Sequence, residues 1–165
     1  MQGKINQPIK MANKVWKIIL IITGSFSLFF LESIIKYSIV NKIPSQGFYL
    51  IPKILQIVYA PNYNIAFSLP LPAILIIILV ILALIFLSYI WWVNLQTGDL
   101  KILTATSLII IGALSNLIDR LIFSYVIDYI NIFIWPIFNL ADVMIVIGIF
   151  IYLFHQKIFN IKKEV

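Results

Sequence analysis

The chain has 165 residues, of which 62% are hydrophobic and 11% are charged, and its formal net charge is +6. This hydrophobic fraction and the mean hydropathy of +1.07 are high for a soluble globular domain, in which about half of the residues are apolar. The composition therefore excludes an ordinary soluble fold and indicates an integral membrane protein. Most of the lysines lie at the two ends of the chain beside apolar runs, which is typical of membrane anchors and not of a nucleic-acid-binding surface.

Rare residue types limit the chemistry. The chain has no cysteine, and His155 is its single histidine. These counts exclude a disulfide framework, a thiolate nucleophile and a cysteine-based metal site. They also argue against a Ser/His/Asp triad or a histidine-rich zinc site. The sequence therefore predicts neither a metal nor another cofactor.

Four apolar stretches are long enough to cross a hydrocarbon core, which needs about 20 helical residues. They predict an all-α integral membrane protein that forms a single membrane-embedded domain over residues 1–165. The predicted transmembrane helices cover residues 15–37, 71–93, 102–119 and 138–154, and the two longer outer segments cover residues 38–70 and 120–137. The first stretch resembles a signal peptide, but Glu32 and Lys36 follow where a small-residue cleavage site is expected, so we expect it to be retained.

The distribution of lysine predicts the orientation. Lysines precede the first predicted helix and follow the last, whereas the loop between the second and third carries only Lys101 opposite Asp99. The positive-inside rule then places both termini and this loop in the cytoplasm. Lys42, Lys53 and Arg120 on the outer side make the bias moderate.

With this topology, the acidic residues gather near the outer membrane surface. Asp99 and Glu164 are the exceptions, and the four others are Glu32, Asp119, Asp128 and Asp142. Charged residues at membrane depth are costly and usually face a protein interior, where they carry function. The sequence therefore predicts a polar site at the outer end of the helices.

Spacing within the helices supports this site. Gly112, Asn116 and Arg120 recur every four residues, and Asn139 and Asp142 are three apart, so each set shares one helix face. In the first outer segment, Asn62 and Asn64 suit turns. The preceding run "GFYLIPKILQIVYA" fits either short strands or an interfacial helix, and periodicity does not separate the two.

Structural and catalytic interpretations compete for the charged residues. Glu32 and Lys36 have the spacing of a helical ion pair, whereas Asp119 and Arg120 are adjacent and each need other partners. Two close carboxylates share a proton and can activate a water for attack on an amide. Asp128 and Asp142, with Arg120 as their nearby cation, can form such a catalytic dyad, and a structural or ion-pathway role stays open. Gly24, Gly112 and Gly148 are interpreted as helix-packing contacts.

The motifs "ESIIK", "NYNIAFS", "GALSNLIDR", "VIDY" and "FNLAD" follow one another over roughly residues 15–154. In this order they resemble the lipoprotein signal peptidase family, also called type II signal peptidases. The resemblance implies a membrane aspartic endopeptidase of the bacterial inner membrane. Its substrates would be diacylglyceryl-modified prolipoproteins, cut on the N-terminal side of the lipidated cysteine. It also implies a small extracytoplasmic β-cradle with a neighbouring short interfacial helix.

The resemblance assigns roles to individual residues. The catalytic aspartates match Asp128 and Asp142. The residues that match the family's substrate-binding positions are Asn62, Asn116, Arg120 and Asn139, and those expected to support the site are Glu32, Lys36, Asp119, Phe138 and Ala141. The expected partners are prolipoproteins and membrane lipid, without nucleic acid, and a monomer is expected because four short-looped helices can bury their own polar faces.

Several positions depart from the family pattern. Glu32 replaces the usual aspartate, Asn64 stands where the family carries glycine, and Ile111 and Ser115 occupy positions that are commonly glycine. Two other functions remain open alternatives. One is an inactive family member that only binds lipoproteins, and the other is a proton or ion carrier that uses the same carboxylates. A carrier would favour ionisable groups at several depths, whereas here they cluster near one face.

Overall fold

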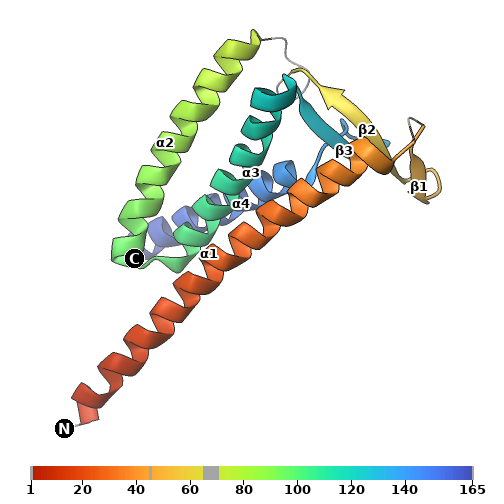
Figure 1. Ribbon diagram of the computed structural model, residues 1–165. Coiled ribbons are helices and arrows are strands. Elements are labelled where there is room, and N and C mark those ends of the chain that lie inside the picture. Colours follow the sequence, from red (N-terminus) through yellow and green to blue (C-terminus); the bar gives the residue numbers. More distant parts are fainter. Residues whose placement is uncertain (1, 45, 65–70, 165) are drawn as a thin grey trace.

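The computed structural model describes residues 2–44, 46–64 and 71–164, and the side chains of residues 11–155 within these ranges. Figure 1 shows four helices and a small sheet, which lies at the end of the bundle opposite the start of α1 and the end of α4. The helices are α1 (Gln2–Lys42), α2 (Ala73–Thr97), α3 (Leu100–Phe123) and α4 (Leu140–Glu164). The predicted helical membrane fold with a small sheet is confirmed.

Three of the described helices can span a membrane by length and composition: Met11–Lys42, Ala73–Thr97 and Leu100–Phe123. The fourth is apolar over Leu140–His155. α1 and α4 both extend beyond the predicted spans. Many large apolar side chains of these helices are exposed, as expected for a membrane protein, because lipid solvates such side chains as well as a protein core does.

α3 is the central helix and packs against the other three (Figure 1). Glycine allows α3 and α4 to approach closely: a Cβ atom at Gly112 would lie 2.5 Å from the carbonyl oxygen of Ala141, and one at Gly148 would lie 2.6 Å from that of Ala105. The packing interpretation is therefore confirmed for these two glycines. It is wrong for Gly24, around which no atom lies within 4 Å of an added Cβ.

Local signals explain the helix ends that bound the site. α3 is capped at its C-terminal end by Ser124, which has a φ of 66° and whose N–H donates to the Arg120 carbonyl. At the start of α4, the Asn139 side chain accepts from the Asp142 N–H at 2.9 Å, and the Asp142 side chain accepts from the Asn139 N–H at 3.2 Å. This reciprocal pair is a capping box built from Asn and Asp. It explains why the helix begins where the motif "FNLAD" lies.

The sheet has the order β1-β2-β3 and is antiparallel throughout. Its strands are β1 (Phe48–Ile51), β2 (Leu55–Asn62) and β3 (Val126–Ile132). The run left open between strands and an interfacial helix therefore forms strands. Within the described parts of the two outer segments, the expected short interfacial helix is absent, because these residues pair as a sheet.

Candidate active site

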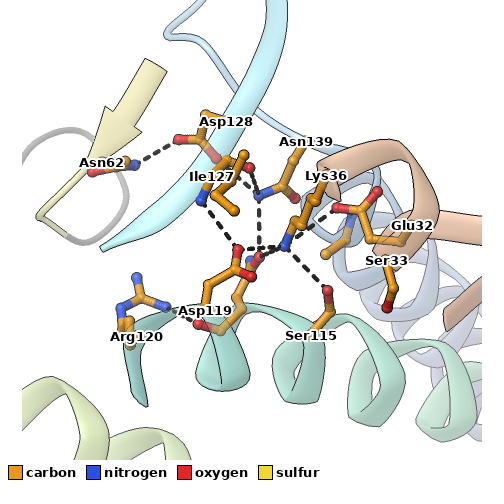
Figure 2. Close-up of polar contacts among 12 residues, drawn as sticks. Glu32, Ser33, Lys36, Asn62, Ser115, Asp119, Arg120, Ile127, Asp128 and Asn139 are labelled. Atoms are coloured by element: carbon orange, nitrogen blue, oxygen red, sulfur yellow. Dashed lines mark hydrogen bonds and ion pairs between the residues drawn. The ribbon is translucent and has the colours of Figure 1, made fainter. Parts of the chain in front are cut away.

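The sheet and the helix ends beside it bring the predicted site residues together, and Figure 2 shows most of them. β2 supplies Asn62, β3 supplies Asp128, and the start of α4 supplies Asn139 and Asp142. α1 supplies Glu32 and Lys36, and α3 supplies Asn116, Asp119 and Arg120. The pairing of Ala60 with Asp128 and of Asn62 with Val126 sets the strand register at the site.

Asp128 lies on β3 and is 2% exposed. Its Oδ2 accepts from the Asn62 side-chain amide and its Oδ1 from the Asn139 side-chain amide, both at 2.8 Å. Burial raises the pKa of Asp128 to about 7, and the nearby charge of Asp142 acts in the same direction, against these two hydrogen bonds. Asp128 therefore holds or releases a proton near neutral pH.

Asp142 lies in the first turn of α4. Its Oδ1 accepts from the Asn116 side-chain amide at 2.8 Å, and its Oδ2 accepts from the Asn139 N–H at 3.2 Å. Each of its carboxylate oxygens therefore accepts one hydrogen bond. Asn139 thus contacts both aspartates, and its side-chain amide also donates to Asn116 Oδ1 at 3.1 Å. The two carboxylates are connected through a pair of asparagines.

Lys36 links α1 to α3. Its Nζ lies 2.7 Å from Asp119 Oδ2 and 3.4 Å from Glu32 Oε1. It also donates to Ser115 Oγ and to Asn116 Oδ1, each at 3.1 Å. The predicted Glu32–Lys36 pair is confirmed, but the shorter ion pair is with Asp119 (Figure 2). Ser115, at a position that is commonly glycine, gives Lys36 an extra acceptor.

Arg120 makes different contacts from those expected of the dyad's cation. Its guanidinium donates to the backbone carbonyls of Asn116 at 3.2 Å and Asn64 at 3.3 Å. Lys36 is the second cation near the aspartates, since its charge acts on Asp128. The interpretation of Arg120 as their one nearby cation is therefore wrong. The Asn64 contact uses the backbone, so the departure from glycine at this position does not remove it.

Asp128 and Asp142 both line a cavity of about 670 Å³. Of the four residues predicted to bind substrate, three also line it: Asn62, Asn116 and Arg120. Asn139 is fully buried and touches the carboxylates instead of the cavity. The apolar part of the lining includes Trp135, Pro136, Ile137, Phe138, Ile145 and Val146. Among the described residues, no three His, Cys, Asp or Glu side chains gather as a metal site.

The supporting residues hold the strand and helix that carry the aspartates. The Phe138 carbonyl accepts from the N–H groups of Tyr129 and Ile130 at 3.0 and 2.8 Å. Ala141 is fully buried and packs with Ile111 and Met144. Ile111 is accommodated in this cluster, because the close approach of α3 to α4 occurs one residue later, at Gly112.

Sequence reasoning missed Tyr129. This residue is 3% exposed, and its hydroxyl contacts Glu32 at 2.5 Å. The motif "VIDY" contained a signal, because strand alternation places Asp128 and Tyr129 on opposite faces. A tyrosine on the buried face of a strand needs a partner for its hydroxyl.

Comparison with known proteins agrees with the motif order. The family model described as Signal peptidase (SPase) II matches residues 24–158. The chain belongs to the signal peptidase II family. It is 41% identical over 130 residues to the lipoprotein signal peptidase of Chlorobaculum parvum, covering 69% of this chain and 79% of that protein. It is 36% identical over 132 residues to that of Halothermothrix orenii, covering 77% and 90% of the two chains.

A solved structure supports the fold of this signal peptidase II family member. A bacterial membrane enzyme determined by the in meso method at 2.3 Å resolution superposes with a TM-score of 0.74 at 30% identity, covering 84% of this chain and 86% of that chain. A second such structure, at 1.9 Å, gives a TM-score of 0.73 at 28% identity. The resemblance inferred from the motifs is confirmed.

Proposed function

We propose that this chain is a membrane aspartic endopeptidase that removes the signal peptide from diacylglyceryl-modified prolipoproteins. Cleavage would occur on the N-terminal side of the lipidated cysteine. Membership of the signal peptidase II family supports the reaction class. The observation that carries the assignment is that Asp128 and Asp142 line one cavity and are both hydrogen-bonded to Asn139.

The two aspartates take different roles in this proposal. At neutral pH, ionised Asp142 accepts a proton from a water as the water oxygen attacks the scissile carbonyl. Protonated Asp128 donates its proton to the carbonyl oxygen, which gives a tetrahedral diol. As the diol collapses, ionised Asp128 takes back a proton from one diol hydroxyl, the C–N bond breaks, and the proton on Asp142 passes to the leaving nitrogen, so both aspartates return to their starting protonation states. The raised pKa of Asp128 supports its role as the proton donor.

The other site residues position the substrate and the dyad. Asn62, Asn116 and Arg120 line the cavity and present amide and guanidinium groups that can bind a peptide backbone. Asn139 positions both aspartates. Lys36 offsets the charge of Glu32 and Asp119, which are both buried beside it. Uncompensated charges at this depth would be costly.

The membrane location fits the substrate. A lipidated signal peptide is itself an apolar helix, and its diacylglyceryl chains can stay in lipid while the scissile bond reaches the carboxylates. The lysine pattern supports a multi-pass protein of the bacterial inner membrane with both termini cytoplasmic and the site near the outer surface. We propose that it acts as a monomer, since four helices with short connections can bury their own polar faces.

A cleavage assay tests the proposal. Purified protein is mixed with a diacylglyceryl-modified precursor and, separately, with the same precursor without the lipid. The wild type should cut the lipidated precursor, whereas Asp128→Asn and Asp142→Asn should not, although both variants should still insert into the membrane. Normal cleavage by either variant would defeat the dyad, and binding without cleavage by the wild type would identify an inactive lipoprotein-binding protein.

A further inference from the structure

Tyr129 lies on the face of β3 opposite Asp128, because successive side chains of a strand point to opposite faces. It is buried in a cluster with Ile39 and Ile127. Its backbone N–H donates to the Phe138 carbonyl at 3.0 Å. The residue therefore sits between α1 and the segment that leads into α4.

The Tyr129 hydroxyl makes two hydrogen bonds. It donates to Glu32 Oε2 at 2.5 Å and accepts from the Leu140 N–H at 3.1 Å. Glu32 Oε1 in turn accepts from the Ala141 N–H at 3.4 Å. The first N–H groups of a helix have no acceptor within the helix, so Tyr129 and Glu32 satisfy two of these groups at the start of α4.

The hydroxyl keeps its proton at neutral pH. Burial raises the pKa of Tyr129, and the carboxylate of Glu32 raises it further. Tyr129 is therefore a permanent donor to Glu32, and the fully buried Glu32 is held by Tyr129 on one oxygen and by Lys36 on the other. These contacts fix the Glu32 carboxylate between α1 and the start of α4.

We propose that Tyr129 is a positioning residue for the aspartate pair, acting with Glu32 to fix the first turn of α4. That turn carries Asp142, and Asn139 at its start donates to Asp128 at 2.8 Å. The Tyr129 hydroxyl thus sets the position of one aspartate relative to the other. The expected effect of Tyr129 on kcat rests on the proposed peptidase function, whereas its expected effect on the first turn of α4 does not.

The kinetic test compares Tyr129→Phe with the wild type on a lipidated precursor. We expect kcat to fall on the order of tenfold, because small displacements of catalytic groups slow the chemical step, while KM changes by less than about twofold. Tyr125→Phe is the matched control. Its hydroxyl is hydrogen-bonded to that of Tyr59 on β2 at 2.6 Å, and its removal should leave kcat unchanged.

Coupling to Glu32 is the sharper test. In a Glu32→Ala background, which lacks the acceptor oxygen, Tyr129→Phe should lower kcat by a smaller factor than in the wild type, because the contact between the two side chains is already absent. Equal factors in both backgrounds would overturn the proposal. An unchanged kcat in Tyr129→Phe, or a rise in KM alone, would also overturn it.

Hydrogen–deuterium exchange gives a readout that does not depend on activity. Exchange at residues 140–143 should be faster in Tyr129→Phe than in the wild type and unchanged in Tyr125→Phe. If the wild type does not cut the precursor, the proposed function fails, and the exchange rates still decide the role of Tyr129. If Tyr129→Phe does not accumulate, Glu32→Asp, whose shorter side chain withdraws the carboxylate from the same contact, should give the same faster exchange. Unchanged exchange would overturn the proposal.

Discussion

The side-chain amide of Asn139 donates to Oδ1 of Asp128 over 2.8 Å. The backbone N–H of the same asparagine donates to Asp142 over 3.2 Å. One residue that does not line the cavity therefore fixes the two carboxylates that do. Its position, immediately before α4, makes the distance between the aspartates depend on how that helix begins.

Asn139→Ala should impair catalysis more than folding. The substitution removes the bridge between the aspartates, and we expect kcat to fall on the order of a hundredfold. The loss of a buried hydrogen-bonding group should lower the free energy of unfolding by about 1–3 kcal/mol. Cleavage kinetics and thermal unfolding in detergent measure the two effects. Asn131→Ala is the control, since the Asn131 amide donates to Gln56 within the sheet at 3.0 Å. A kcat loss of the same size in Asn131→Ala would contradict the assignment.

The activity should fall as the pH rises above neutral. Asp128, with a pKa of about 7, must be protonated in the proposed mechanism. Above this pH, kcat should decrease by about tenfold per pH unit, as expected for loss of one proton. A pH–rate profile over roughly pH 5–9 measures this, with membrane insertion checked at each pH. A profile that is flat across neutral pH would refute the role of Asp128 as the proton donor.

The same raised pKa predicts the pH dependence of stability. The folded state holds the Asp128 proton to higher pH than the unfolded chain does, because Asp residues in an unfolded chain have a pKa of about 3.9. This contribution to stability is fully present below about pH 4 and is lost as the pH rises through about 7. Asp128→Asn has no proton to lose at this position. The melting temperature of the wild type should therefore fall relative to that of the variant as the pH rises through this window.

Much of the architecture was predictable because hydropathy and helical periodicity are local. The spacing of Gly112, Asn116 and Arg120 correctly predicted a shared face, since Gly112 meets α4, Asn116 bonds to Asp142 and Arg120 lines the cavity. The acidic residues were placed at one end by counting lysines. These inferences needed no knowledge of which helices are neighbours.

The cross-helix partners were not predictable. Lys36 pairs with Asp119 over 2.7 Å, and that contact depends on how α1 packs against α3. The choice between strands and an interfacial helix depended on the pairing of β2 with β3, which brings together residues far apart in the chain. Gly24 resembles a packing residue in sequence, yet it faces no neighbour. Tertiary geometry decides such cases.

Lys36→Met should destabilise the protein strongly. It leaves the buried carboxylates of Glu32 and Asp119 without their cation, and breaking a buried ion pair costs about 3–5 kcal/mol. Adding Asp119→Asn should recover part of this loss, because one charge is then removed. Lys42→Met, at the exposed end of the same helix, is the control and should change stability little. Thermal unfolding measures all three. Equal stability of Lys36→Met and Lys42→Met would contradict the buried network.

The proposed orientation can be tested with single cysteines, because the chain has none. Ile134→Cys lies in the turn after β3, where Ile134 is 90% exposed. Gln96→Cys lies at the exposed opposite end, near the end of α2. A membrane-impermeant thiol reagent applied to spheroplasts should label position 134 and leave position 96 unlabelled until the membrane is opened. The reverse pattern would invert the topology and exclude cleavage at the outer surface.

Gly112→Ala should push α3 away from α4. The new Cβ would lie 2.5 Å from the Ala141 carbonyl oxygen and 2.8 Å from Ile145 Cγ1, both closer than van der Waals contact allows. Overpacking of this kind costs about 1–3 kcal/mol. Because Asn116, one turn later, donates to Asp142 across the same interface, kcat should fall as well. Gly24→Ala introduces the same methyl group into open space and should leave kcat unchanged. Similar kcat values for the two variants would show that the α3–α4 contact does not control the distance between the aspartates.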